Sequence, residues 1–209
     1  RDGGEEAKSL AATQHERFRT LEWRVAHSGE LRGVDTGFSC LDPPSINEMT
    51  QGLRKGHVVV VAAKPSIGKT TLAVNIAVNA SQRIRLQGTE RNRVAIFSLE
   101  MEHEELEDRI LAQLSGVASS RIQGGHLGGE DWAKVSEALQ AMTELAIHVD
   151  DRPGQTVTDI RHRSRHLLAE HGALDLLVID YVQLMPGTLA RRGATRNEEI
   201  TDIAVRLKE

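Results

Sequence analysis

The residues best suited to chemistry lie in one short stretch, AAKPSIGKTT, at residues 62–71. It fits the order GxxxxGK followed by Ser or Thr, which is typical of phosphate-binding loops, except that Ala63 replaces the first glycine. Gly68 would let the backbone approach phosphate, Lys69 would bring a cation to the transferring group, and the Thr70 hydroxyl could ligate magnesium. The alternative is a chance match in a loop that opens a helix. The predicted nucleotide-binding residues of this loop are Lys64, Pro65, Ser66, Ile67, Gly68, Lys69, Thr70 and Thr71.

Two carboxylates are candidates for the rest of a nucleotide site. Asp180 ends the apolar run LLVID, and a carboxylate at the carboxyl end of a parallel strand faces the ligand crevice, where it can hold magnesium through water. Glu100 follows the run VAIFSL and would point into the same crevice as the base for the attacking water. Tyr181 follows Asp180, so a glutamate beside the metal-binding aspartate is missing. The alternatives are that Asp180 simply ends a strand and that Glu100 begins a solvated acidic helix.

Four apolar runs would position these residues: HVVVVA at 57–62, VAIFSL at 94–99, AIHVD at 146–150 and LLVID at 176–180. The runs lack polar alternation and helical stretches separate them, which predicts strands buried on both faces. We therefore expect an α/β fold with a mostly parallel sheet flanked by helices.

The first part of the chain has a different pattern. Residues 5–27 are highly charged, and Phe18, Leu21 and Val25 are spaced three and four apart, which predicts one helix with a narrow apolar stripe. A segment rich in glycine and proline follows and indicates a linker into the core. The sequence thus predicts a linker helix and tether at 1–32 and a core at 33–209.

Composition narrows the possible classes of protein. The chain is 39% hydrophobic and 27% charged, as is typical of globular proteins. It has one cysteine, and no apolar run approaches the roughly 18 residues of a membrane span, which together favour a reducing cytoplasm. The net charge is −4, so any contact with nucleic acid would need a local basic patch.

Four segments together resemble a known family: AKPSIGKTTLAVNIA, VAIFSLEM, HVDDRPGQTVTDIRHRSRHLLAEHG and LLVIDYVQLM. They are similar to the C-terminal RecA-like motor of DnaB-family replicative DNA helicases, from about Gly33 to the end of the chain. The resemblance implies a P-loop NTPase that binds and hydrolyses ATP with Mg²⁺ and translocates on single-stranded DNA as a homo-hexamer. That family also has alanine at the entrance of its phosphate loop and takes its catalytic glutamate from the SLEM strand, which accounts for Ala63 and Glu100. By the same resemblance, Arg109 would lie near the nucleotide base.

The resemblance also implies a DNA contact in the segment PGTLARRGATRN at 186–197. In the family the corresponding loop lines the channel of the hexamer, and Arg191, Arg192 and Arg196 could hold successive phosphates of a single strand. The segment contains no aromatic residue, so these contacts would be to the backbone and insensitive to base sequence. A solvated turn with incidental arginines is the alternative.

Some features of the family lie outside these 209 residues, namely the sensor glutamine, the arginine finger and the primase-binding domain. The resemblance therefore implies a core that is incomplete at its C-terminus and poorly active alone. It also implies primase and a helicase loader as partners through the missing regions. One function of a different class stays open, a DnaB-like nucleotide-binding scaffold in plasmid, phage or defence biology that does not unwind DNA.

Overall fold

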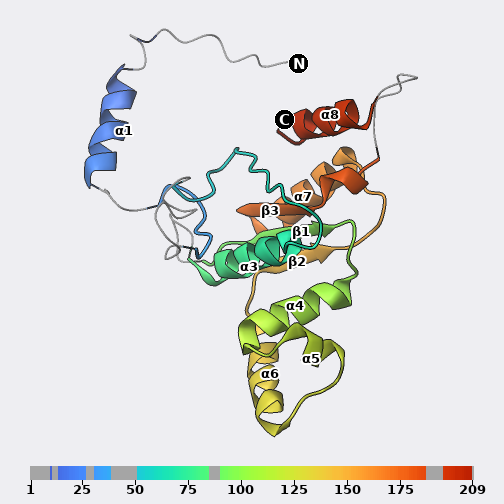
Figure 1. Cartoon of the computed structure of the whole chain (residues 1–209). Coiled ribbons are helices and arrows are strands. Elements are labelled where there is room, and N and C mark those ends of the chain that lie inside the picture. Colours follow the sequence, from blue (N-terminus) through green and yellow to red (C-terminus); the bar gives the residue numbers. More distant parts are fainter. Residues whose placement is uncertain are drawn as a thin grey trace. The chain divides into compact units, whose positions relative to one another are not determined.

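The computed structural model describes most of the chain and divides it into two units, Arg1–Leu31 and Arg32–Glu209. The described residues are 10, 14–26 (without the side chain of Arg24), 31–38, 51–84, 90–186 and 195–208. The first unit contains helix α1 (Gln14–Ala26), and the second contains the sheet and all the other helices of the described residues (Figure 1).

The second unit is built on a three-stranded parallel sheet, β1 (Val94–Ser98), β2 (Ile147–Asp150) and β3 (Leu176–Asp180), in the order β2-β1-β3. These strands confirm three of the four apolar runs, within one residue at each end. Burial differs from the prediction, because only β1 is buried along its whole length, whereas β2 and most of β3 are partly exposed. Since a parallel strand needs a crossover to reach its neighbour, a helix lies between successive strands.

The predicted strand at 57–62 is wrong. The structure assigns no strand to residues 57–64, and the four valines at 58–61 are between 47% and 78% exposed. Among the described strands, β3 pairs only with β1 and leaves its other edge without a neighbour. A segment is a β-strand only when it is hydrogen-bonded to a neighbouring strand. A run of β-branched residues favours an extended backbone, but it does not show that a neighbouring strand is present.

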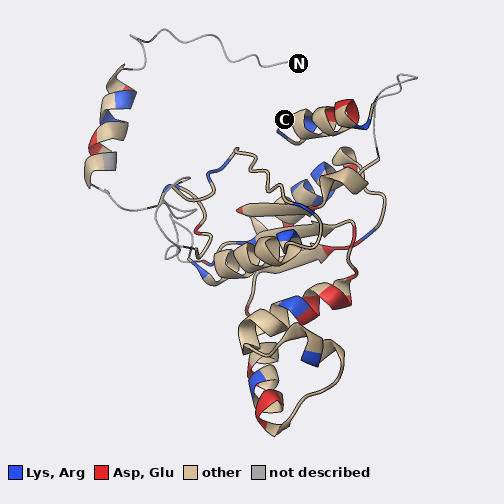
Figure 2. Cartoon of the chain, in the orientation of Figure 1, with Lys and Arg blue, Asp and Glu red and all other residues tan. Residues whose placement is uncertain are grey.

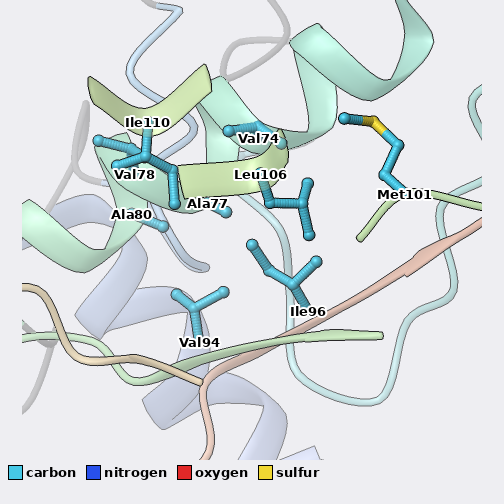
Figure 3. Packing of buried hydrophobic residues seen from close by; sticks show 9 residues of the cluster. All are labelled: Val74, Ala77, Val78, Ala80, Val94, Ile96, Met101, Leu106 and Ile110. Atoms are coloured by element: carbon cyan, nitrogen blue, oxygen red, sulfur yellow. The ribbon is translucent and has the colours of Figure 1, made fainter. Parts of the chain in front are cut away.

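Helices cover both faces of the sheet. The side chains of β1 point alternately to the two faces, so each face carries apolar side chains that a helix must cover. Val94 and Ile96 pack with residues of α3 (Lys69–Gln82) and α4 (His103–Ser115), as Figure 3 shows. Ala95 and Phe97 pack on the opposite face with α7 (Val157–His171) and α8 (Arg196–Lys208). The remaining helices are α5 (Ser119–Gln123), α6 (Gly129–Met142) and the 3-10 turn η2 (Val182–Leu184). None of the described helices is both long and apolar enough to cross a bilayer.

Helix α1 lies inside the stretch 5–27 for which the sequence predicts a helix, and the parts of that stretch at 5–9, 11–13 and 27 are outside the described residues. Its predicted apolar stripe is present, and Phe18, Leu21 and Val25 are 63%, 44% and 77% exposed. A helix with such an uncovered stripe has little to stabilise it in water by itself.

The loop between β2 and α7 is held together by the carboxylate of Asp150. Arg152 donates from Nη2 to Oδ2 at 2.7 Å and from Nε to Oδ1 at 2.9 Å, and Gln155 donates to Oδ1 at 3.1 Å. The hydrogen bonds from Arg152, helped by the positive charge of Arg163, hold the pKa of Asp150 below its ordinary value. The ionised form of Asp150 therefore stabilises the folded state.

We expect Asp150→Asn to lower the free energy of unfolding by about 1 kcal/mol near neutral pH, because a charged acceptor is replaced by a neutral one. The contribution of the wild-type carboxylate is fully present above the unfolded-state pKa of about 3.9 and is lost as the pH falls through the lower folded-state pKa. Urea unfolding from pH 6 to pH 3 would measure both effects. The control is Asp108→Asn, since the side chain of Asp108 in α4 makes no hydrogen bond or ion pair with the described residues; an equal acid dependence of both variants would contradict the assignment.

Candidate active site

The loop before α3 turns the chain sharply into the helix. Gly68 has φ 102° and ψ 28°, a left-handed conformation that favours glycine, and Ser66 also has a positive φ of 62°. Among the described residues other than glycine, only Gln51 and Ser66 have a positive φ. Ala63 therefore has a backbone conformation open to any L-residue, which explains how alanine can replace the first glycine of the pattern.

Lys69 connects the end of this loop to its beginning. Its Nζ donates to the carbonyl oxygen of Ala63 at 3.3 Å and to that of Lys64 at 3.2 Å. These contacts use backbone oxygens, so they do not depend on the side chain at position 63. An ammonium group has three donors, and the third stays available for an anion in the loop.

Asp180 ends β3 and is 8% exposed. Its Oδ2 atom is enclosed and has no hydrogen-bond partner among the described residues. A buried carboxylate oxygen without a partner costs free energy, and a magnesium ion with its water shell would provide what the oxygen lacks. The donor set therefore fits the predicted magnesium site, with the Thr70 hydroxyl in the first turn of α3 as the other predicted ligand.

Glu100 lies close to Asp180 because of the strand register. Ser98 pairs with Asp180 across β1 and β3, and the N–H of the next residue, Leu99, donates to the Asp180 carbonyl oxygen at 2.7 Å. Glu100 follows directly, is exposed, and comes before α4, which begins at His103. The structure thus brings together the carboxyl ends that carry the two predicted carboxylates.

Two residues that sequence reasoning missed hold the turn around Glu100. The Ser98 hydroxyl donates to the Met101 carbonyl oxygen at 2.7 Å and accepts from the Met101 N–H at 3.1 Å. Asp151, from the loop after β2, accepts from the His103 N–H at 2.9 Å and so satisfies a free donor at the start of α4. The serine at the end of the strand was a signal in the sequence for the contact between Ser98 and Met101. The contact between Asp151 and His103 joins residues distant in sequence and had no such signal.

Arg109 reaches the first turn of α3 from α4. Its Nη1 atom donates to Thr71 Oγ1 at 3.1 Å, and its Nε atom is enclosed without a partner among the described residues. The structure therefore brings Arg109 to the helix that the candidate phosphate loop opens. Its contact with a nucleotide base stays a prediction.

The predicted DNA contacts fall partly outside the described residues. Arg191 and Arg192 lie in the segment 187–194, which the structure does not describe. Arg196 begins α8, donates from Nη2 to the carbonyl oxygens of Gln183 at 2.6 Å and Met185 at 2.8 Å, and donates from Nη1 to Glu199 at 2.6 Å. The guanidinium thus closes the end of η2, and its contact with DNA stays a prediction.

Charge is distributed unevenly over the helices around this site (Figure 2). Acidic residues occupy the first turn of α4, where Glu104 and Glu105 lie near the positive end of the helix dipole. These carboxylates lie within the helix, whereas Glu100 lies before it. Glu100 is therefore not one of the acidic residues in the first turn of α4 that stabilise the start of the helix.

Comparison with known proteins gives a consistent result. Residues 33–209 match the family model of the DnaB-like helicase C terminal domain. The replicative DNA helicase DnaB of Geobacillus stearothermophilus is 37% identical over 191 residues, which cover 91% of this chain and 39% of that relative. This chain therefore spans well under half the length of that relative.

Solved structures agree with the sequence match. A DnaB-like replicative helicase, studied with its interactions with primase, superposes with a TM-score of 0.79 at 26% identity, over 99% of this chain and 46% of that one. A second solved structure, of an ATPase domain, gives the same TM-score and identity, over 97% of this chain and 66% of that one. Together with the loop that opens α3 and the adjacent strand ends that carry Asp180 and Glu100, these matches confirm the resemblance found in the sequence. The chain has the RecA-like fold of these solved structures and belongs to the family of DnaB-like helicases, whose C-terminal domain model matches residues 33–209.

Proposed function

We propose that this chain is the ATP-hydrolysing motor module of a replicative DNA helicase that translocates on single-stranded DNA. One observation carries the proposal: the loop that opens α3 and the enclosed, unpaired carboxylate oxygen of Asp180 belong to the same α/β unit. A scaffold that bound nucleotide without turnover would not need Glu100 beside Asp180. ATP and Mg²⁺ are the proposed cofactors.

The proposed chemistry assigns one task to each residue. The loop residues 64–71, apart from Pro65, which has no N–H, would hold the phosphates with their backbone N–H groups and with the dipole of α3. Thr70 would ligate the magnesium ion, and Asp180 would hold it through water; the ion would neutralise charge that develops on the phosphates. Lys69 would place its ammonium on the transferring phosphoryl group, and Glu100 would accept a proton from the attacking water.

The proposed partners rest on the relatives. Both the sequence relative and one solved neighbour are replicative helicases, and that neighbour was studied with primase. We propose that the intact protein forms a homo-hexamer in the cytoplasm and binds single-stranded DNA through Arg191, Arg192 and Arg196. Primase and a helicase loader would bind regions outside this chain. Residues 1–32 would act as linker helix and tether to the ATPase core at 33–209.

The first test concerns the phosphate loop. Lys69→Ala removes a charged donor, and we expect the affinity for Mg·ATP to fall at least about tenfold in titration calorimetry. Lys134→Ala is the matched control, because Lys134 is an exposed lysine of α6 outside the site. Unchanged ATP binding by the Lys69 variant would contradict the nucleotide site.

The second test separates binding from turnover. Glu100→Gln keeps the shape of the side chain but cannot accept a proton, so the intact protein should bind ATP and lose about a hundredfold or more in steady-state hydrolysis. Glu104→Gln changes a neighbouring exposed carboxylate and should keep the parental rate. If the Glu100 variant hydrolyses ATP at the parental rate, the base lies elsewhere.

The third test concerns α1, whose exposed stripe needs a surface to cover it. If that surface is the neighbouring subunit of a ring, deletion of residues 1–27 should abolish oligomers of the intact protein in sedimentation and leave ATP affinity nearly unchanged. Phe18→Asp with Leu21→Asp should act in the same way, and Arg19→Ala, on the opposite face of α1, should not. A ring that persists after the deletion would show that α1 packs on its own subunit.

A further inference from the structure

A line of polar side chains joins α3 to α4 beside the candidate active site. Thr71, Asn75 and Asn79 are spaced four residues apart on α3, so they lie on one face of the helix. Arg109 and Gln113, also four apart, face them from α4. Apolar side chains of the two helices, such as Val74 and Ile110, belong to one core cluster.

One end of this line fixes α4 against α3. Gln113 Nε2 donates to Asn79 Oδ1 at 3.1 Å and to the Asn75 carbonyl oxygen at 3.5 Å. Asn79 is itself held, because its Nδ2 donates to the Thr36 carbonyl oxygen at 3.0 Å. The backbone of α4 therefore has a defined position one turn away from Arg109.

The other end fixes the side chain of Arg109. Thr71 Oγ1 is the only hydrogen-bond acceptor that the described residues offer to this side chain, at 3.1 Å from Nη1. The Nε atom of the guanidinium is enclosed, so the inner part of the group is shielded from solvent. A guanidinium is planar, so enclosure at Nε together with one hydrogen bond at Nη1 restricts its plane as well as its position.

The hydroxyl of Thr71 has a different task from that of its neighbour. Lys69, Thr70 and Thr71 form the first turn of α3, and each presents a backbone N–H towards the phosphate loop. The Thr71 side chain is directed to Arg109 rather than to the loop, since its oxygen accepts from Nη1. A loss of this hydroxyl would leave the N–H groups unchanged and release the guanidinium.

We propose that Thr71 is a positioning residue, whose hydroxyl holds the Arg109 guanidinium in the plane that packs against the base of the nucleotide. The inference rests on the proposed function. In it, the pair Thr71–Arg109 contributes the part of the ATP affinity that depends on the base. The phosphate-binding loop contributes the part of the ATP affinity that does not depend on the base. A freed arginine would lose side-chain entropy each time it bound the base, which weakens binding.

Thr71→Val is the direct test, because valine has nearly the same shape as threonine and lacks the hydroxyl. Titration calorimetry of the whole chain would measure its affinity for Mg·ATP and for Mg·tripolyphosphate, which has no base. We expect the ratio of the two affinities to fall about fivefold, the effect of one hydrogen bond. Thr71→Ser keeps the hydroxyl and should keep the wild-type ratio.

Arg109→Ala completes a double-mutant cycle. Arg109→Ala should lower the ratio of the Mg·ATP affinity to the Mg·tripolyphosphate affinity at least as far as Thr71→Val does. The double variant should lower this ratio no further than Arg109→Ala alone, since the two residues act as a unit. A purely structural role of Thr71 would instead lower both affinities together and lower the thermal unfolding midpoint, and that result would overturn the inference.

The outcomes separate this inference from the proposed function. If the wild-type chain bound neither ligand, the nucleotide site would be wrong and the inference with it. If the wild type bound both ligands and Thr71→Val kept the wild-type ratio, the inference would fall and the nucleotide site would stand. An additive effect in the double-mutant cycle would also overturn the inference.

Discussion

The parallel pairing of β1 with β3 is the constraint on which the candidate site depends. Parallel strands end at the same edge of a sheet, and the register places Ser98 opposite Asp180. The Leu99 N–H donates to the Asp180 carbonyl oxygen, so the chain that leaves β1 is held beside the end of β3 before it reaches Glu100. A shift of this register by one residue would turn the Asp180 side chain to the other face and move Glu100 away from it.

The burial of β1 stabilises this register. All five of its residues are buried. Val94 and Ile96 pack in the cluster with α3 and α4, and Ala95 and Phe97 pack in the cluster with α7 and α8. Both faces of the sheet therefore resist sliding, because a shift of β1 by one residue would exchange the side chains that fill the two clusters, and Phe97 would have to pack where Val94 and Ile96 fit. The helix that the phosphate loop opens and the strand end that carries Asp180 are thus positioned by the same core.

The sequence predicted the parts of this arrangement that depend on local pattern. The runs at 94–99, 146–150 and 176–180 became strands, and the family resemblance was confirmed. The run at 57–62 looked equally apolar but has no assigned strand, because pairing depends on a neighbour that periodicity does not reveal. The contacts of Asp151 and Thr71 could not be predicted, since each depends on how two separate elements pack. The contact of Ser98 is with Met101, only three residues away.

The contacts of Arg196 have a mechanical consequence for the segment between β3 and α8. The guanidinium binds the carbonyl oxygens of Gln183 and Met185, so it joins the chain on either side of residues 187–194. A displacement of the start of α8 would therefore be transmitted through Arg196 to the turn that directly follows β3. The carboxylate of Asp180 lies only a few bonds from that turn.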